Sequence, residues 1–160
     1  MESTEPIGVG QPAPDFTLMG PGGMPFTLSE FRGQKNVILV FFPAAFSPVC
    51  SHQLPQMQKD TGQFDAIDAV VIGVSVDNYH ANQAFAERLG LSFPLLSDAR
   101  REVSAAYGVL STSRGTSGRA LFVIDKQGLI AYRDVSTNPG DIAQIPSSDG
   151  VIAALRGPGA

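Results

Sequence analysis

Cys50 is the one cysteine in the 160-residue chain, and its thiol is the side chain best suited to chemistry. It follows a strand-like apolar run, then a turn that contains Pro43, then Pro48 at a candidate helix start. This order places the thiol in the first turn of a helix, where unpaired amides and the helix dipole favour thiolate over thiol. The sequence therefore indicates a nucleophile at Cys50, although a lone cysteine is more often a small buried hydrophobe.

The elements that must position Cys50 alternate between strand-like and helix-like patterns. Continuous β-branched and aromatic runs predict strands buried on both faces, and apolar residues three or four apart predict helices. The expected strands span residues 36–42, 69–76, 93–96, 120–124 and 129–135, and the expected helices span 48–64, 79–89, 101–107 and 141–155. Short alternating stretches at 16–18 and 26–28 predict an N-terminal β-hairpin. Together they predict an α/β fold with a central sheet covered by helices on both faces.

Length and composition favour one globular domain. With 43% hydrophobic and 16% charged residues the chain can form a core, and we expect one domain over 1–160, loosely ordered at its Gly- and Pro-rich ends outside about 7–155. Eleven basic against fifteen acidic residues give a net charge of −4, which argues against a nucleic-acid partner. The apolar run at 37–45 is much shorter than the ~20 residues of a membrane helix, so no membrane partner is expected.

Several further patterns carry expectations about location and ligands. Glu2 and Glu5 stand where a secretory signal would carry positive charge, which favours a cytoplasmic protein. One cysteine cannot form an intramolecular disulfide. One cysteine and two isolated histidines also lack metal-ligand spacing, so we expect no metal and no cofactor. The stretch from Gly115 to Gly118 lacks the lysine of a phosphate loop and is interpreted as a flexible connection.

The segment Pro43-Ala44-Ala45-Phe46-Ser47-Pro48-Val49-Cys50 resembles the PxxxTxxC active-site motif of peroxiredoxins of the AhpC/TSA type. Ser47 stands for the motif threonine and keeps its hydroxyl. Further similarity lies in APDF with Leu18 (13–18), FPLLSD (93–98), AYGV (106–109) and Arg119 before ALFVID (120–125). The resemblance covers roughly 7–155 and is greatest to the one-cysteine alkyl hydroperoxide reductase E group. It implies a thioredoxin-like fold.

The resemblance also implies a role for each motif residue. Cys50, as thiolate, would attack a peroxide and become a sulfenic acid, releasing water or an alcohol. Arg119 would stabilise the thiolate and bind peroxide oxygens, and the Ser47 hydroxyl would bond to sulfur or peroxide. Pro43 would form the pocket wall. Gln53, three residues after Cys50, occupies the place where relatives carry Glu, Gln or His, and would orient Arg119.

No second cysteine is present to resolve the sulfenic acid, and Pro55 stands where a related group often has a resolving cysteine. The expected function is therefore reduction of hydrogen peroxide and organic hydroperoxides, with recycling by an external thiol. That reductant would be a low-molecular-weight thiol or a thioredoxin-, glutaredoxin- or mycoredoxin-like protein. A homodimer that pairs near the active site is a further expectation.

Three other functions compete with a peroxidase. A thiol-disulfide exchanger needs Cys-x-x-Cys, which Cys50-Ser51-His52-Gln53 lacks, although monothiol exchange stays open. A non-catalytic thioredoxin-fold binding or chaperone module would use Cys50 only as a buried side chain. A cysteine hydrolase would need a nearby histidine: His52 faces away from Cys50 on a helix, and nothing in the sequence brings His80 to it.

Overall fold

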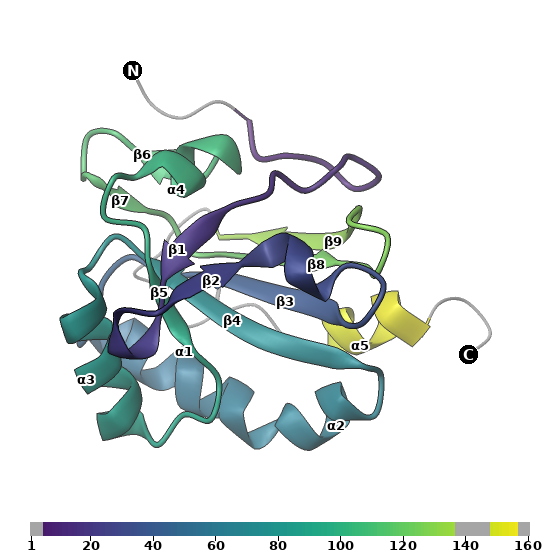
Figure 1. Cartoon of the computed structure of the whole chain (residues 1–160), viewed down its shortest axis with the longest axis horizontal. Coiled ribbons are helices and arrows are strands. Elements are labelled where there is room, and N and C mark those ends of the chain that lie inside the picture. The colour runs from purple at the N-terminus through teal and green to yellow at the C-terminus, as the bar shows by residue number, and fades with distance from the viewer. Residues whose placement is uncertain (1–4, 137–147, 157–160) are drawn as a thin grey trace.

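A seven-stranded mixed sheet runs through the molecule in the order β2-β1-β5-β4-β3-β8-β9 (Figure 1). The structure is a computed structural model, and it describes residues 5–136 and 148–156. The strands are β1 (Thr17–Met19), β2 (Pro25–Thr27), β3 (Asn36–Phe41), β4 (Ala69–Ser75), β5 (Leu95–Ser97), β8 (Ala120–Ile124) and β9 (Ile130–Val135). Because β3, β4 and β5 are parallel, their carboxyl ends meet at one edge of the sheet.

The two faces of the sheet are covered unequally. The helices are α1 (Pro48–Lys59), α2 (Thr61–Asp65), α3 (Tyr79–Leu89), α4 (Glu102–Ala106) and α5 (Ser148–Arg156), with 3-10 turns η1 (Pro21–Gly23) and η2 (Leu28–Phe31). One apolar cluster contains buried residues of α1, α2, α3 and α5. On the opposite face, the N-terminal segment, η2 and the short α4 supply the cover. The sequence pattern predicts helices on both faces. On this second face the only α-helix among the described residues that contributes to the cover is the short α4, and the rest of the cover is the N-terminal segment and η2.

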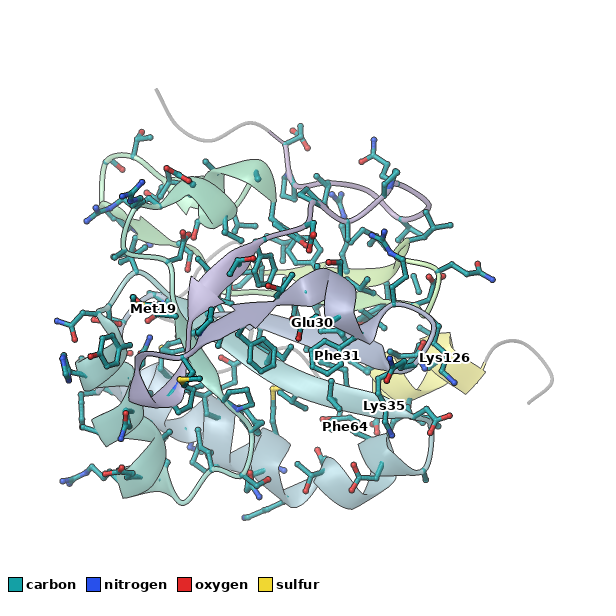
Figure 2. The ribbon with its side chains drawn as sticks, in the orientation of Figure 1. Met19, Glu30, Phe31, Lys35, Phe64 and Lys126 are labelled. Atoms are coloured by element: carbon teal, nitrogen blue, oxygen red, sulfur yellow. The ribbon has the colours of Figure 1, made fainter. Side chains whose placement is uncertain are left out.

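The central strand β3 explains why its sequence is an unbroken apolar run. Its side chains alternate between the clusters, with Leu39 and Phe41 packed on one face and Ile38 and Val40 on the other, and all four have no exposed surface. Aromatic rings extend both clusters: Phe64 belongs to the cluster that contains residues of α1, α2, α3 and α5, and Phe31 packs against the cluster on the opposite face (Figure 2). Burial on both faces of the strand is what the β-branched run predicted.

Most expected elements are present, and the differences have local causes. The strand expected at 93–96 is β5 (Leu95–Ser97), and the helix expected at 101–107 is α4. The expected helix at 48–64 is two helices, because the chain leaves helical geometry at Asp60 (φ −93°, ψ 1°). Of the helix expected at 141–155, residues 141–147 lie outside the described part of the chain.

The prediction of a flexible connection between Gly115 and Gly118 is wrong. The structure pairs β6 (Leu110–Ser111) with β7 (Thr116–Ser117) in a two-stranded antiparallel sheet. Two-residue strands carry no detectable periodicity, which is why the sequence pattern missed them. Among the described residues, no helix is long and apolar enough to cross a lipid bilayer.

Candidate active site around Cys50

Cys50 lies in the first turn of α1, where the sequence pattern placed it. Ser47 is the N-cap residue and Pro48 the first helical residue, and the Ser51 amide donates to the Ser47 carbonyl at 2.9 Å. The Cys50 side chain has no exposed surface and packs in the cluster between α1 and the sheet. The thiol is thus held at the carboxyl end of β3 and shielded from solvent.

The chain reaches α1 through an unusual turn at Phe46. Its φ of 66° lies in the left-handed region, which disfavours any residue with a Cβ. The Phe46 ring lies 5.0 Å from that of Phe85 on α3, and its side chain is 51% exposed. The turn reverses the chain between Pro43, which is half-buried, and Ser47.

Arg119 reaches Cys50 because of the register of the sheet. Phe41, near the end of β3, pairs with Ala120 at the start of β8, so Arg119 lies beside the connection to α1. Its Nη2 donates to the Cys50 Sγ at 3.2 Å, and its side chain is 1% exposed. The guanidinium therefore places a permanent positive charge and a hydrogen-bond donor directly against the buried sulfur.

Gln53 contacts the opposite arm of the same guanidinium. It is fully buried, and its Oε1 accepts a hydrogen bond from Arg119 Nη1. One guanidinium therefore joins the side chains of Cys50 and Gln53, which lie one helical turn apart on α1. The sequence-based placement of Gln53 against Arg119 agrees with this geometry.

Two buried polar atoms at this site have unmet hydrogen-bonding capacity. Among the described residues, Ser47 Oγ and Gln53 Nε2 are the buried side-chain oxygen and nitrogen atoms without a hydrogen-bond partner. Leaving such a group unpaired costs roughly 1–3 kcal/mol, so it is uncommon away from functional sites. Ser47 lies three residues before Cys50 and Gln53 three residues after it. The arrangement is therefore suited to a small polar ligand that approaches the sulfur.

The loop between β3 and α1 is held by residues that the sequence reasoning missed. Asp77 Oδ2 accepts a hydrogen bond from the Ala45 amide at 2.8 Å, and Ser117 Oγ donates to the Phe42 carbonyl at 3.2 Å. A signal for Asp77 existed: it follows β4, which runs parallel to β3 and ends at the same edge. Ser117 gave no such signal, because β7 was not predicted.

The histidines stand apart from this arrangement. His52 and His80 are both exposed, and the His80 ring lies 4.1 Å from that of Tyr79. Within residues 5–136 and 148–156, no three His, Cys, Asp or Glu side chains gather closely enough to hold a metal ion. The group that the structure joins at the thiol is Cys50, Arg119 and Gln53, and neither histidine belongs to it.

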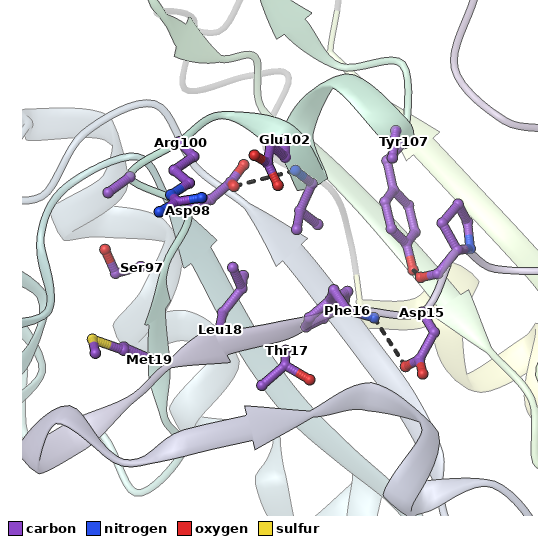
Figure 3. Close-up of a pocket in the computed structure, with 14 residues that line it drawn as sticks. Asp15, Phe16, Thr17, Leu18, Met19, Ser97, Asp98, Arg100, Glu102 and Tyr107 are labelled. Carbon is purple, nitrogen blue, oxygen red and sulfur yellow. Dashed lines mark hydrogen bonds between the residues drawn. The ribbon is translucent and has the colours of Figure 1, made fainter.

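A separate pocket lies on the opposite face of the sheet. Its volume is about 580 Å³, and β1 and α4 border it (Figure 3). Phe16, Leu18 and Tyr107 are among its lining residues, and the Tyr107 hydroxyl donates to the Pro14 carbonyl at 2.7 Å. Phe16 and Tyr107 belong to the apolar cluster that does not contain Cys50. This pocket is therefore distinct from the surroundings of the thiol.

Comparisons with known proteins agree on one family. A sequence model described as "AhpC/TSA family" matches residues 9–133. Alkyl hydroperoxide reductase E of Mycobacterium tuberculosis is 36% identical over 151 residues, covering 93% of this chain and 98% of the relative. The chloroplastic 2-cysteine peroxiredoxin of Chattonella marina var. antiqua is 36% identical over 140 residues, covering 81% and 71%. The crystal structure of peroxidoxin BcpB from Mycobacterium tuberculosis superposes with a TM-score of 0.81 at 30% identity, covering 92% of this chain and 96% of that one.

Proposed function

The chain belongs to the AhpC/TSA family of peroxiredoxins, which are thiol-dependent peroxidases, and we propose that it acts through Cys50 alone. Its substrates are hydrogen peroxide and organic hydroperoxides. The observation that carries the proposal is the hydrogen bond from Arg119 to the buried Cys50 sulfur. A permanent cation against the thiol would stabilise the thiolate that attacks the peroxide, and its N–H groups would donate to the departing oxygen.

Oxidation of Cys50 requires the thiolate, the peroxide and one proton from solvent. The Cys50 thiolate attacks the terminal peroxide oxygen, so that an S–O bond forms while the O–O bond breaks. Sulfur loses two electrons and becomes a sulfenic acid. The other oxygen leaves as hydroxide or alkoxide and takes up a proton from solvent, which replaces the proton that the thiol lost on ionising, so that water or an alcohol is released. Negative charge grows on that oxygen in the transition state, where Arg119 and the Ser47 hydroxyl stabilise it.

Gln53 and Pro43 support this step without taking part in bond making. Gln53 Oε1 accepts from one arm of the Arg119 guanidinium and so fixes the plane of the other arm toward sulfur. Pro43 has no N–H and a rigid φ, so it lines the approach to the thiolate without competing for its hydrogen bonds.

Recycling depends on a second molecule, since the chain contains a single cysteine. The sulfenic acid forms a mixed disulfide with an external thiol, releasing water, and a second thiol then frees the Cys50 thiolate. The reductant is a low-molecular-weight thiol or a thioredoxin-, glutaredoxin- or mycoredoxin-like protein. This cycle requires a pool of reducing thiols, which supports a cytoplasmic location. Pairing of two copies near the active site is part of the same proposal.

Stopped-flow oxidation of the reduced protein tests the proposal directly. Hydrogen peroxide and an organic hydroperoxide are each mixed with wild type and with Cys50→Ser, and sulfenic acid is located by mass spectrometry. We expect oxidation at Cys50 to be at least about 10²-fold faster than that of free cysteine at the same pH. Oxidation no faster than free cysteine would contradict the proposal and favour a non-catalytic binding module. Light scattering that finds only monomer at micromolar concentration would contradict the dimer.

The reductant is tested separately with the oxidised protein. Sulfenic acid prepared with one equivalent of peroxide is mixed with candidate thiols, and the loss of sulfenic acid is followed by mass spectrometry. We expect a mixed disulfide at Cys50, followed by return of the free thiol when excess reductant is present. Failure of every thiol class to consume the sulfenic acid would contradict recycling by an external thiol.

A further inference from the structure

A hydrogen-bonded group of residues links the loop before Cys50 to two neighbouring strands. The carboxyl ends of β3, β4 and β5 meet at one edge, and each is followed by or contains one member: Ala45 after β3, Asp77 after β4, and Ser97 at the end of β5. Ser97 Oγ donates to the Asp77 carbonyl at 2.6 Å, and the Asp77 amide donates to Ser75 Oγ at 3.3 Å. The peptide groups of Asp77 are thus fixed from both sides.

This fixed backbone aims the Asp77 carboxylate at the active-site loop. Oδ2 accepts from the Ala45 amide and from Ser75 Oγ, both at 2.8 Å. Hydrogen bonds to a carboxylate are stronger than those to a neutral acceptor. Ser75 has no exposed surface, so one of these donors is fully removed from solvent. The hydrogen bond from the Ala45 amide holds the loop at its midpoint between Pro43 and Ser47.

The loop needs such an anchor because its own geometry is unfavourable. Phe46, the residue after Ala45, adopts a φ of 66°, in the left-handed region that is unfavourable for a residue with a Cβ. A strained turn persists only where surrounding contacts over-determine it. The bond from Ala45 to Asp77 and the packing of Phe46 on Phe85 are two such contacts.

Helix capping does not account for the Asp77 carboxylate. The cap of α3 is Asn78, whose Oδ1 accepts from the Ala81 amide at 2.9 Å. Asp77 lies one residue earlier and directs its carboxylate to a different element, 32 positions away in sequence. The Asp77 carboxylate therefore connects the segment after β4 to the loop between β3 and α1.

We propose that Asp77 is a positioning residue for peroxide reduction, which holds the Pro43–Ser47 loop so that the Ser47 hydroxyl and Pro43 stay in place over Cys50. The inference rests on the proposed function for its kinetic consequence and on the contacts of Asp77 for the anchor itself. Loss of the anchor slows peroxide attack, since small displacements of positioning groups cost up to about 10²-fold in rate. It also uncovers the buried sulfur for reagents that need no positioning.

The test compares two rates that respond in opposite directions. Asp77→Ala should lower the second-order rate of Cys50 oxidation by peroxide by about 10- to 100-fold. The same variant should raise the rate of Cys50 alkylation by iodoacetamide, which needs only an accessible thiolate. Circular dichroism at the assay temperature establishes that the variant is folded.

Asp98→Ala is the matched control. Asp98 also follows a parallel strand and accepts from backbone amides, those of Val103 at 3.2 Å and Ser104 at 2.7 Å, but it ties α4 instead of the active-site loop. We expect it to lower thermal stability while leaving both rates within about two-fold of wild type. Equal slowing of oxidation by the two variants would overturn the proposal, because general destabilisation would then explain it.

Asp77→Asn replaces Asp77→Ala in both rate measurements if the alanine variant does not fold. It keeps an acceptor oxygen but loses the charge, so both rates should change in the same directions by at least about two-fold. Unchanged rates in the folded variant would overturn the proposal. If wild type itself reacts with peroxide no faster than free cysteine, the proposed function fails, while the alkylation comparison still decides whether Asp77 holds the loop.

Discussion

Arg119 donates a hydrogen bond to the Cys50 sulfur at 3.2 Å, across 69 positions of sequence and with neither side chain appreciably exposed. The contact follows from two features of the sheet. Strand β3 leads directly into the turn and helix that carry Cys50, and the antiparallel register of β3 with β8 brings Arg119 to the same end. A shift of one residue in that register would turn the arginine to the other face. The pairing of β3 with β8 therefore determines whether the Arg119 guanidinium can contact the Cys50 thiol.

Replacing Arg119 with lysine should slow peroxide attack while keeping a positive charge. A lysine has one charged nitrogen in place of the planar pair of donors, so it cannot reproduce the two separate contacts that Arg119 makes with Cys50 and Gln53. Loss of one positioned donor costs about 10²- to 10³-fold in rate, and we expect a fall of that size in stopped-flow oxidation.

The control for this substitution is Arg88→Lys, at an exposed position on α3. It should leave the oxidation rate unchanged, because its side chain lies on the protein surface. An Arg119→Lys protein that is folded and oxidises at the wild-type rate would remove Arg119 from the mechanism.

Replacing Ser47 with alanine should affect activity and stability in opposite directions. The Ser47 Oγ is buried and has no partner among the described residues, so its removal forfeits no hydrogen bond of the resting protein. We expect the free energy of unfolding to stay level or rise by about 1 kcal/mol. Peroxide oxidation should fall about ten-fold or more, since a donor to the reacting oxygens is lost.

Thermal denaturation and stopped-flow oxidation measure the two effects of Ser47→Ala. Ser47→Thr is the matched variant, because it restores the hydroxyl and should recover most of the rate. A clear loss of stability in Ser47→Ala would mean that the hydroxyl serves the fold, contrary to this prediction.

Much of the fold follows from the sequence because burial leaves a plain pattern. The predicted thioredoxin-like α/β fold is confirmed, and β3, β4 and β8 lie where continuous apolar runs placed them. Such runs are readable because a strand buried on both faces excludes polar residues. The break at Asp60 and the β6-β7 pair were missed because each depends on one or two residues, too few for a period.

The site divides along a similar line. Cys50, Ser47 and Pro43 are neighbours in sequence, so their motif could be recognised without a structure. Arg119 was found through resemblance, and its contact with sulfur could be established only from the register of β3 and β8. The Asp77 anchor had no motif, and its one signal was its position after β4, which ends at the same sheet edge as β3.

Replacing Gln53 with leucine should reduce activity through Arg119. Leucine fills similar volume but has no acceptor for Arg119 Nη1, so the guanidinium loses the contact that fixes its plane. We expect stopped-flow oxidation to slow by about ten-fold, less than in Arg119→Lys. Double-mutant analysis separates the two residues: in the Arg119→Lys background, Gln53→Leu should have little further effect. Independent, additive losses would contradict a role that runs through Arg119.

Removing the Tyr107 hydroxyl should change how stability depends on alkaline pH. Burial, and secondarily the negative charge of Asp15, raise the pKa of Tyr107 above its ordinary value of 10.0. Below pH 10 the phenol is protonated in folded and unfolded chains alike. Above that pH the unfolded chain ionises first, so the stability that Tyr107 contributes is progressively lost as pH rises toward the folded-state pKa.

Tyr107→Phe removes this ionisation together with the hydrogen bond to the Pro14 carbonyl. At neutral pH we expect the variant to lose about 1 kcal/mol of unfolding free energy, because that bond is gone while the ring contacts with Phe41 and Phe122 remain. Above pH 10 its stability should fall less steeply than that of wild type, so the two curves converge. Urea unfolding at a series of pH values measures both effects. Parallel curves above pH 10 would mean that the Tyr107 phenol does not govern the alkaline limit of the fold.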